Sequence, residues 1–208
     1  MSQIDCRIEQ STGRITLRRP EALNALTYEM CERLEAALMA WKDDEKVSQV
    51  IIDAEGEKAF CAGGDIAKLY HKGRAGYFTD VQAFWREEYR LNSLIHHYPK
   101  PYIGFLQGYV MGGGVGISCH GSHRIVGNTT QMAMPECAIG LVPDVGGSYL
   151  LARAPGLTGR FLGITGYRMN AADALHAGFA DSFIAEDRWS KVIEELVSAG
   201  TPGPLSSF

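Results

Sequence analysis

The chain has 208 residues, of which 46% are hydrophobic and 21% charged, and its formal net charge is −4. This length fits one domain, and this composition excludes a disordered chain and a strongly basic nucleic-acid-binding protein. The apolar runs are short and broken by glycine or charge, so no membrane-spanning helix is predicted.

The first residues predict a β-hairpin followed by an amphipathic helix. Residues 4–9 and 14–18 alternate apolar and polar side chains around Ser11-Thr12-Gly13, which is a hairpin signal. Thr27 has the side chain of a helix N-cap. The apolar stripe of the helix that follows is Met30, Leu34, Leu38 and Trp41.

Helices and strands then alternate along the middle of the chain. Residues 50–52 predict a short buried strand, and the loop 60–65 opens a short helix. A longer helix is predicted over about 79–97 and a strand over 102–106, after which residues 111–114 open another helix.

The later part of the chain becomes helical. Residues 123–126 and 131–134 predict strands, and beyond Gly146 the pattern indicates short helices broken at Pro155, Gly159 and Gly166. Because strands and helices alternate over most of the chain, the predicted fold class is α/β.

The cysteines and the N-terminus indicate a compartment. The five cysteines are scattered without a CxxC pair, which predicts free thiols, no disulfide framework and no metal. The first ten residues carry charges and no apolar segment, so neither a signal peptide nor a transit peptide is predicted. Together these features predict a cytoplasmic protein.

One carboxylate falls on the apolar stripe of the long helix. The stripe contains Val81, Phe84, Trp85, Leu91 and Ile95, and Glu88 lies on it whereas Glu87 does not. A carboxylate on an apolar face is unfavourable unless it is paired or faces a cavity. Two interpretations of Glu88 stay open. It is a structural residue, at the edge of the stripe or paired with a nearby arginine, or it is a carboxylate that faces a pocket.

Two glycine clusters follow strand-like segments and open helices. Free N–H groups at such turns bind anions or developing negative charge, and two converging turns would form an oxyanion hole. Neither cluster, at 60–65 or at 111–114, has the lysine of a phosphate-binding P-loop or fits a dinucleotide-binding unit. Taken alone, such a cluster is more often just a tight turn.

Two further acids flank an apolar segment with proline and glycine on either side. Glu136 follows Pro135, and Asp144 precedes Gly146. Asp144 could cap the next helix. Alternatively, Glu136 and Asp144 form an acid–base or nucleophile pair whose pKa values are set by a shared apolar pocket.

Together these segments resemble the crotonase (enoyl-CoA hydratase/isomerase) superfamily over residues 4–195. Residues 19–26 are similar to the family's first CoA-contacting loop, and 60–66 and 111–114 are similar to its two oxyanion loops. The resemblance implies one domain, residues 1–208, with a spiral of ββα units over about 1–155 and a helical part over about 156–208.

The resemblance also implies site residues. The oxyanion amides fall on Gly64 and Gly113, and no cofactor is implied because coenzyme A is part of the substrate. The positions expected to contact substrate are Glu88, Ala22, Leu23, Ala25, Ala62, Asp65 and Ile66.

The side chains favour one branch of the superfamily. Hydratases use two glutamates, of which the first falls on Gly116 here and the second on Glu136. Asp144 stands where hydratases usually carry glycine, and this combination resembles the 3-hydroxyisobutyryl-CoA hydrolase branch. The implied activity is an acyl-CoA thioesterase of valine breakdown, with Glu136 and Asp144 as catalytic residues.

Two other functions stay open: an enoyl-CoA hydratase or isomerase acting on short acyl-CoA, and a non-catalytic remnant of the fold. That branch normally continues into a large helical C-terminal portion, so we expect either a truncated chain or cover from another copy. Self-association as a trimer or dimer is a further expectation. His96 and His97 are interpreted as structural or solvated, and His120 and His123 as core or interface histidines rather than bases.

Overall fold

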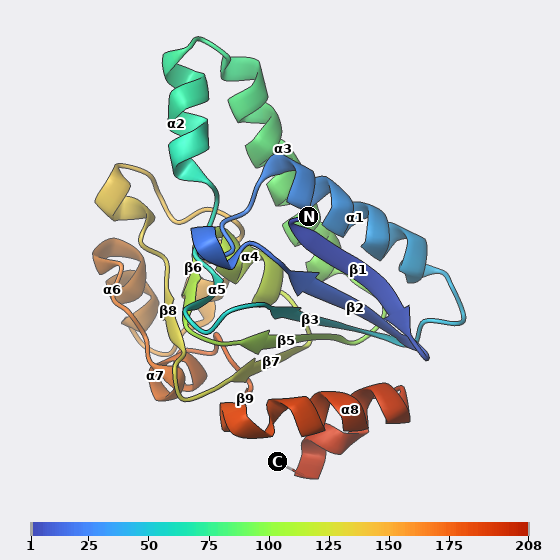
Figure 1. The fold of residues 1–208 in the computed structure, drawn as a ribbon. Coiled ribbons are helices and arrows are strands. Elements are labelled where there is room, and N and C mark those ends of the chain that lie inside the picture. The colour runs from blue at the N-terminus through green and yellow to red at the C-terminus, as the bar shows by residue number, and fades with distance from the viewer. Residues whose placement is uncertain (1, 208) are drawn as a thin grey trace.

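Two sheets form the centre of the molecule in a computed structural model, which describes residues 2–207 (Figure 1). The larger sheet has six strands in the order β1 (Ile4–Glu9), β2 (Thr12–Leu17), β3 (Gln49–Ala54), β5 (Tyr102–Leu106), β7 (His123–Val126) and β9 (Ser182–Phe183). The smaller sheet has three strands in the order β4 (Ala59–Cys61), β6 (Tyr109–Met111) and β8 (Gln131–Ala133).

Successive strands alternate between the two sheets. In each of the pairs β3–β4, β5–β6 and β7–β8, the first strand joins the larger sheet and the second joins the smaller one. Within both sheets all neighbours are parallel except β1 and β2. This arrangement is the spiral of ββα units that the resemblance implied, and the α/β prediction is confirmed.

The helix α4 (Gly113–Ser118) lies in the interior of this spiral. All six of its residues are buried, and it packs against β4 and β6 of the smaller sheet and β5 of the larger one. A helix buried on every side must be apolar or small. The sequence of α4 meets this need with glycine, valine and isoleucine.

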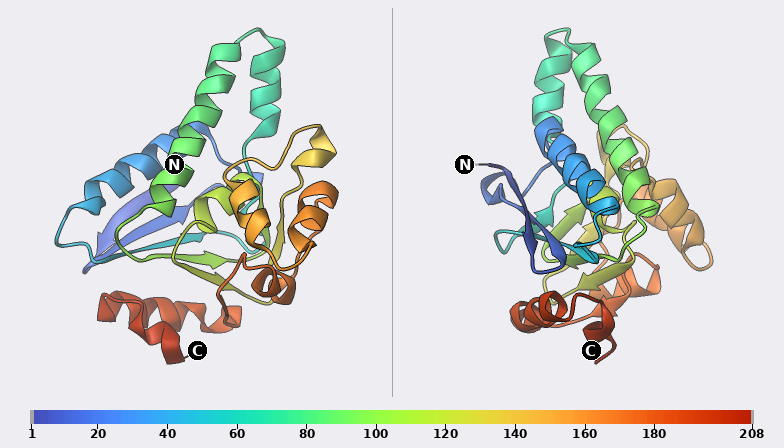
Figure 2. Two further views of the ribbon diagram at one scale, coloured as in Figure 1. Left: turned by 180° about the vertical axis from the view of Figure 1, so that it is seen from behind. Right: turned by 90° about the vertical axis from the view of Figure 1, so that its right-hand side faces the viewer.

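Helix α1 (Tyr28–Lys42) packs on the larger sheet through β1. Helix α3 (Phe78–His96) packs against α1 and α4, and α2 (Ile66–Arg74) packs against α3. The Thr27 hydroxyl accepts a hydrogen bond from Met30 N, as predicted, and the predicted apolar stripe of α1 is buried. The hairpin of α2 and α3 projects beyond the sheet (Figure 2).

The last third of the chain is helical, with α5 (Gly147–Arg153), α6 (Thr158–Thr165), α7 (Ala171–His176) and α8 (Trp189–Ala199). Four short 3-10 helices complete the fold: η1 (Pro20–Ala22), η2 (Glu136–Ile139), η3 (Glu186–Arg188) and η4 (Gly203–Ser207). Helix α8 lies on the face of the larger sheet opposite α1 (Figure 1). Its Trp189, Val192 and Leu196 form a second apolar core with Phe105 and its neighbours.

Several predicted boundaries differ from the structure. The second strand begins at Thr12, because residues 12 and 13 pair with Gln49 and Val50 of β3. The strands β4, β6 and β9 were not predicted. Gly159 does not break a helix but lies within α6, where a Cβ atom would collide with the backbone of Leu151.

Within residues 2–207, no helix combines the length and apolar character needed to cross a membrane. In the same part of the chain, no group of three or more His, Cys, Asp or Glu side chains is placed to hold a metal ion.

Candidate active site

The first glycine turn presents a free amide. Leu26 and Gly64 form a parallel β-bridge in which Leu26 N donates to Gly63 O at 2.8 Å and Asp65 N donates to Leu26 O at 2.9 Å. In such a bridge one residue, here Leu26, makes both hydrogen bonds, and the N–H of the residue opposite it points away from that segment. The Gly64 N–H is therefore turned toward the opposite side, where α4 begins.

The second glycine turn presents a matching amide. Gly113 is the first residue of α4, and the first N–H groups of a helix have no partner within the helix. Gly112 before it has φ +46°, a conformation that favours glycine. A Cβ atom on Gly113 would lie 3.2 Å from Gly64 N, so the two turns meet. Within residues 2–207 neither amide donates a hydrogen bond.

These two turns line a cavity of about 180 Å³ together with three carboxylic acids. Glu88 comes from α3, Glu136 from η2, and Asp144 from the loop before α5. The carboxyl groups that the sequence singled out separately are thus brought to one cavity. Apolar side chains of Phe84, Trp85, Ile139 and Leu141 form much of the remaining wall.

Glu88 is 2% exposed, and its Oε1 atom is buried without a hydrogen-bond partner among the described residues. No arginine or lysine of residues 2–207 pairs with it, so the pocket alternative holds and the ion-pair alternative does not. A Cβ atom on Gly113 would collide with Glu88 Oε1. Glycine at position 113 therefore leaves space for this carboxyl group beside the first turn of α4.

Glu136 is also largely buried, at 6% exposed. Its Oε1 atom would lie 2.7 Å from a Cβ atom on Gly112, which places the carboxyl group against the second turn. Its Oε2 atom is buried without a partner among the described residues. One carboxyl oxygen of Glu136 is thus next to the turn that carries the Gly113 amide.

Asp144 does not cap the helix that follows, because the N-cap of α5 is Gly146. The capping interpretation is therefore wrong. Instead, Asp144 Oδ2 accepts a 2.7 Å hydrogen bond from the Tyr89 hydroxyl. This bond links the loop of Asp144 to α3, one residue after Glu88.

Burial raises the pKa of all three carboxyl groups, and repulsion between their charges adds to the rise at Glu88 and Glu136. Burial, with smaller contributions from the charges of Asp144 and Glu136, raises the pKa of Glu88 to about 8. Burial and the charge of Asp144 raise the pKa of Glu136 to about 7. The pKa of Asp144 is also raised by burial, although the Tyr89 hydrogen bond opposes this. At neutral pH Glu88 is therefore a hydrogen-bond donor, while Glu136 is near its titration midpoint.

The predicted substrate-contacting residues separate into two groups. Ala62 and Ile66 line the 180 Å³ cavity. The predicted positions Ala22, Leu23 and Ala25 lie outside its lining, in the loop alongside the first turn, where Ala62 N donates to Leu23 O at 3.0 Å.

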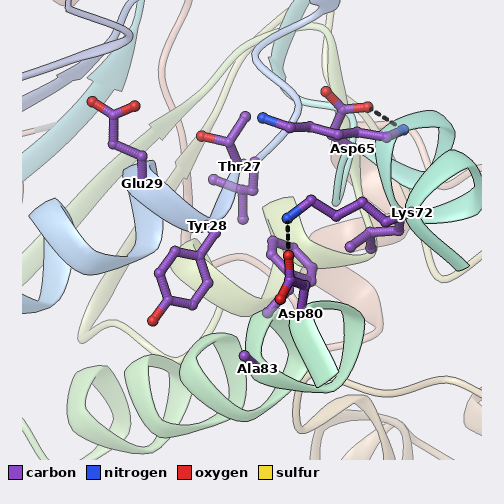
Figure 3. Close-up of a pocket in the computed structure, with 11 residues that line it drawn as sticks. Thr27, Tyr28, Glu29, Asp65, Lys72, Asp80 and Ala83 are labelled. Carbon is purple, nitrogen blue, oxygen red and sulfur yellow. Dashed lines mark hydrogen bonds and ion pairs between the residues drawn. The ribbon is translucent and has the colours of Figure 1, made fainter. Parts of the chain in front are cut away.

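Asp65 is occupied by other contacts. Its carboxylate accepts from Arg19 Nη2 at 2.8 Å and from Lys68 N at 3.1 Å, which caps α2. It borders a second cavity of about 440 Å³ between α1, α2 and α3, which Figure 3 shows with the Lys72–Asp80 ion pair across it. Phe84 contributes to the walls of both cavities.

Tyr89 is the contact that the sequence did not reveal. It lies next to Glu88 in the chain, yet its orientation toward Asp144 depends on how the loop before α5 packs on α3. Its place directly after Glu88 in the chain was the signal that the sequence offered.

Comparison with known proteins agrees with this geometry. The family model described as enoyl-CoA hydratase/isomerase matches residues 12–205. The chain belongs to the enoyl-CoA hydratase/isomerase family. It is 46% identical over 190 residues to the Danio rerio protein named 3-hydroxyisobutyryl-CoA hydrolase, mitochondrial, a match that covers 91% of this chain and 50% of the relative.

Solved structures of the family are also similar. One described as an enoyl-CoA hydratase from Rhodobacter sphaeroides 2.4.1 is 55% identical with a TM-score of 0.93, covering 96% of this chain and 59% of that one. A structure described as a carnitinyl-CoA dehydratase from Mycobacterium thermoresistibile is 42% identical with a TM-score of 0.96. The match covers 100% of this chain and 61% of that one. The chain spans about half the length of the curated relatives that it matches.

The cytoplasmic prediction is contradicted by this comparison. The relatives from Danio rerio and Homo sapiens are both named as mitochondrial proteins of this family. The prediction depended on the scattered cysteines and on the residue types at the start of this sequence.

Gly116 has no room for a side chain in this member of the family. A Cβ atom there would lie 2.8 Å from Asn92 Nδ2 and 2.8 Å from Val145 Cβ. Gly116 is the position where the resemblance places the first hydratase glutamate. A second carboxyl group therefore comes from the loop of Asp144 and not from α4.

The Gly113→Ala substitution is expected to reduce turnover by about 10²–10³-fold. The added methyl group would collide with Glu88 Oε1 and crowd Gly64 N, which would separate the two amides. Steady-state hydrolysis of an acyl-CoA checks this. Gly73→Ala is the matched control, because a Cβ atom in that helical position meets nothing within 4 Å. Equal loss in both variants would contradict the role of the Gly113 turn.

Proposed function

We propose that the protein hydrolyses a short β-hydroxyacyl-CoA thioester, with 3-hydroxyisobutyryl-CoA as the leading candidate, as a step of valine breakdown. The observation that carries the proposal is one cavity lined by Glu136, Asp144 and the two turns of Gly64 and Gly113, whose amides donate no hydrogen bond among residues 2–207. The name of the curated hydrolase relatives, at 46% identity for the Danio rerio protein, supports this choice among the reactions of the family.

In the proposed reaction, the thioester carbonyl oxygen accepts hydrogen bonds from Gly64 N and Gly113 N. When the carbonyl carbon is attacked, its oxygen becomes an oxyanion, and amides already aimed at that position stabilise the charge without reorganising. The buried, largely apolar walls strengthen these hydrogen bonds by excluding bulk water. The scissile C–S bond then breaks as the oxyanion collapses, and coenzyme A leaves as the thiol after protonation.

Glu136 supplies the attack in one of two ways. Its carboxylate either adds to the carbonyl carbon, giving an anhydride that water then hydrolyses, or removes a proton from the attacking water. Both roles need the ionised form of Glu136. The position of its Oε1 atom beside Gly112, next to the Gly113 amide, suits either role.

Asp144 and Glu88 would recognise and assist the polar end of the substrate. Asp144, held by the Tyr89 hydroxyl, would orient the β-hydroxyl or the water and shuttle a proton. Protonated Glu88 can donate a hydrogen bond to that hydroxyl or to Asp144. Buried polar groups discriminate strongly against substrates that leave them unpaired, which favours a hydroxylated acyl group over a plain one.

Hydrolysis is expected to follow a bell-shaped pH profile. The rate should fall below pH about 7 as Glu136 becomes protonated, since only its carboxylate acts. It should fall again above pH about 8 as Glu88 loses the proton that it donates. Measurement of kcat/KM from pH 5 to 10 checks this.

The Glu88→Gln variant separates the two arms of the profile. An amide keeps a donor at every pH. The kcat/KM of this variant should therefore still fall at low pH but should no longer fall at high pH. An alkaline limb that is unchanged in Glu88→Gln would contradict the donor role of Glu88.

The activity is tested by measuring CoA release with a thiol reagent from 3-hydroxyisobutyryl-CoA and crotonyl-CoA in parallel. The proposal expects rapid release from the first and little reaction with the second. Hydration of crotonyl-CoA without CoA release would instead identify a hydratase, the activity given for the 55% identical Rhodobacter structure. Binding of acyl-CoA without turnover would indicate a non-catalytic member.

We also propose that the protein self-associates. Apolar side chains of Val142, Leu157 and Ile164 are 68%, 69% and 73% exposed around a cavity of about 870 Å³. Light scattering coupled to size-exclusion chromatography measures the mass. A monomer at micromolar concentration would contradict this expectation.

A further inference from the structure

The loop that carries Asp144 is held in an unfavourable conformation. Val145, the next residue, has φ +45°, and its side chain is 2% exposed. A β-branched residue in the left-handed region is strained, and such strain persists only where surrounding contacts impose it. Contacts that hold the backbone of Val145 also constrain the backbone of Asp144, the residue before it.

One of these contacts is made by His120. Its Nε2 atom lies 2.8 Å from Val145 O. Because a carbonyl oxygen can only accept, Nε2 carries the hydrogen and donates it. The next residue, Gly146, has φ +76°, and a Cβ atom there would lie 2.7 Å from His120 Cε1. The imidazole ring thus lies directly against the backbone of residues 145 and 146.

The other contact is made by α4 itself. The Val145 side chain packs on Gly116, where an added Cβ atom would lie 2.8 Å from Val145 Cβ. Gly113 is the first residue of the same helix, and His120 comes two residues after its last. The first residue of α4 carries the amide proposed for the oxyanion hole. Gly116 in the middle of the helix and His120 just after its end contact the loop of Asp144.

The surroundings of His120 disfavour its protonated form. Burial lowers its pKa, the Val145 hydrogen bond opposes this, and His96 and Arg124 lower it further. The rings of His96 and Tyr149 lie 5.8 Å and 6.5 Å from it, between centroids. Its Nδ1 atom is buried without a partner among residues 2–207, so a proton there would be unfavourable. The tautomer that donates to Val145 O is the one this environment favours.

We propose that His120 is a positioning residue for the thioesterase reaction, which clamps Val145 against Gly116 of α4 and so aims Asp144 into the cavity. This inference rests on the proposed function. Through α4, the clamp couples the position of the Gly113 amide to that of Asp144. His120 itself lies outside the lining of the catalytic cavity and touches no reacting atom.

The test compares His120→Leu with His120→Gln. Leucine fills space but donates nothing, whereas the glutamine amide nitrogen can replace Nε2 as donor to Val145 O. We expect His120→Leu to lower kcat by about 10–100-fold with KM little changed, because a small displacement of a catalytic group has effects of this size. His120→Gln should restore most of the rate.

The pH profile distinguishes positioning from a general loss of stability. The Asp144 charge helps to raise the pKa of Glu136, so displacing Asp144 should move the acid limb of kcat/KM to lower pH. Asp144→Asn, which removes that charge directly, supplies the reference shift. His120→Leu should shift the limb in the same direction, and His120→Gln should not. The proposal would be overturned if His120→Leu were slow but kept the acid limb of kcat/KM at the wild-type pH. It would also be overturned if His120→Leu had the wild-type rate.

Crystal structures of the same two variants keep this test separate from the activity. The Tyr89–Asp144 hydrogen bond of 2.7 Å should be lost in His120→Leu and kept in His120→Gln. Retention of that bond in His120→Leu would overturn the clamp. A wild-type protein that hydrolyses no acyl-CoA would count against the proposed function, while the structures would still decide the clamp.

Discussion

Replacing Glu136 by glutamine is expected to lower kcat for thioester hydrolysis by at least about 10³-fold while acyl-CoA affinity stays within about threefold. An amide can neither attack the carbonyl carbon nor accept the proton of water at these rates. Its shape is nearly that of the acid, so the wall beside Gly112 is preserved. Turnover is measured by CoA release, and affinity by titration with the same ester.

Glu194→Gln is the matched control for this substitution. Glu194 is exposed on α8, which covers the far face of the larger sheet. The control should behave as wild type. Near-normal turnover of Glu136→Gln would contradict the role assigned to Glu136, whichever of the two chemical routes the wild type follows.

Replacing Asp144 by glycine is expected to reduce hydrolysis by about 10²–10⁴-fold, the usual contribution of a positioned acid–base group. The substitution also removes the acceptor of the Tyr89 hydroxyl, which links the loop to α3. Asp144→Asn keeps a side chain of the same shape and should show a comparable loss if the charge is what matters. CoA release from 3-hydroxyisobutyryl-CoA measures both variants.

The same variants bear on the relation to hydratases. Asp144→Gly should gain no hydration of crotonyl-CoA, because position 116 has no room for a second glutamate beside Asn92 and Val145. Asp187→Gly, at an exposed position of η3, is the control for a general effect of glycine. If hydratase turnover rises when Asp144 is removed, the site retains the machinery of a hydratase and Asp144 diverts it to hydrolysis.

The long elements were predictable because their side-chain periodicity extends over many residues. The stripe of α1 and its Thr27 cap are examples, since a 15-residue helix repeats its apolar positions several times. The strands β4 and β6 have three residues each, too few for any period to show. Their existence depends on pairing with each other, which only the tertiary structure supplies.

The candidate site was predictable to the extent that it lies in local motifs. Glycine turns and the apolar stripe with Glu88 on it are features of neighbouring residues, and the structure brings them to one cavity. The Tyr89–Asp144 bond joins residues 55 positions apart, and the His120–Val145 contact joins residues 25 positions apart. Neither partner has a local signature, so both contacts required coordinates.

The central claim is that the amides of Gly64 and Gly113 together hold the thioester oxygen opposite the carboxyl groups. A crystal structure of Glu136→Gln with bound 3-hydroxyisobutyryl-CoA tests it most directly. The carbonyl oxygen is expected about 2.7–3.1 Å from both amide nitrogens, with the acyl hydroxyl near Asp144 or Glu88. A bound ester whose carbonyl oxygen contacts neither amide, or whose acyl group lies outside this cavity, would contradict the account.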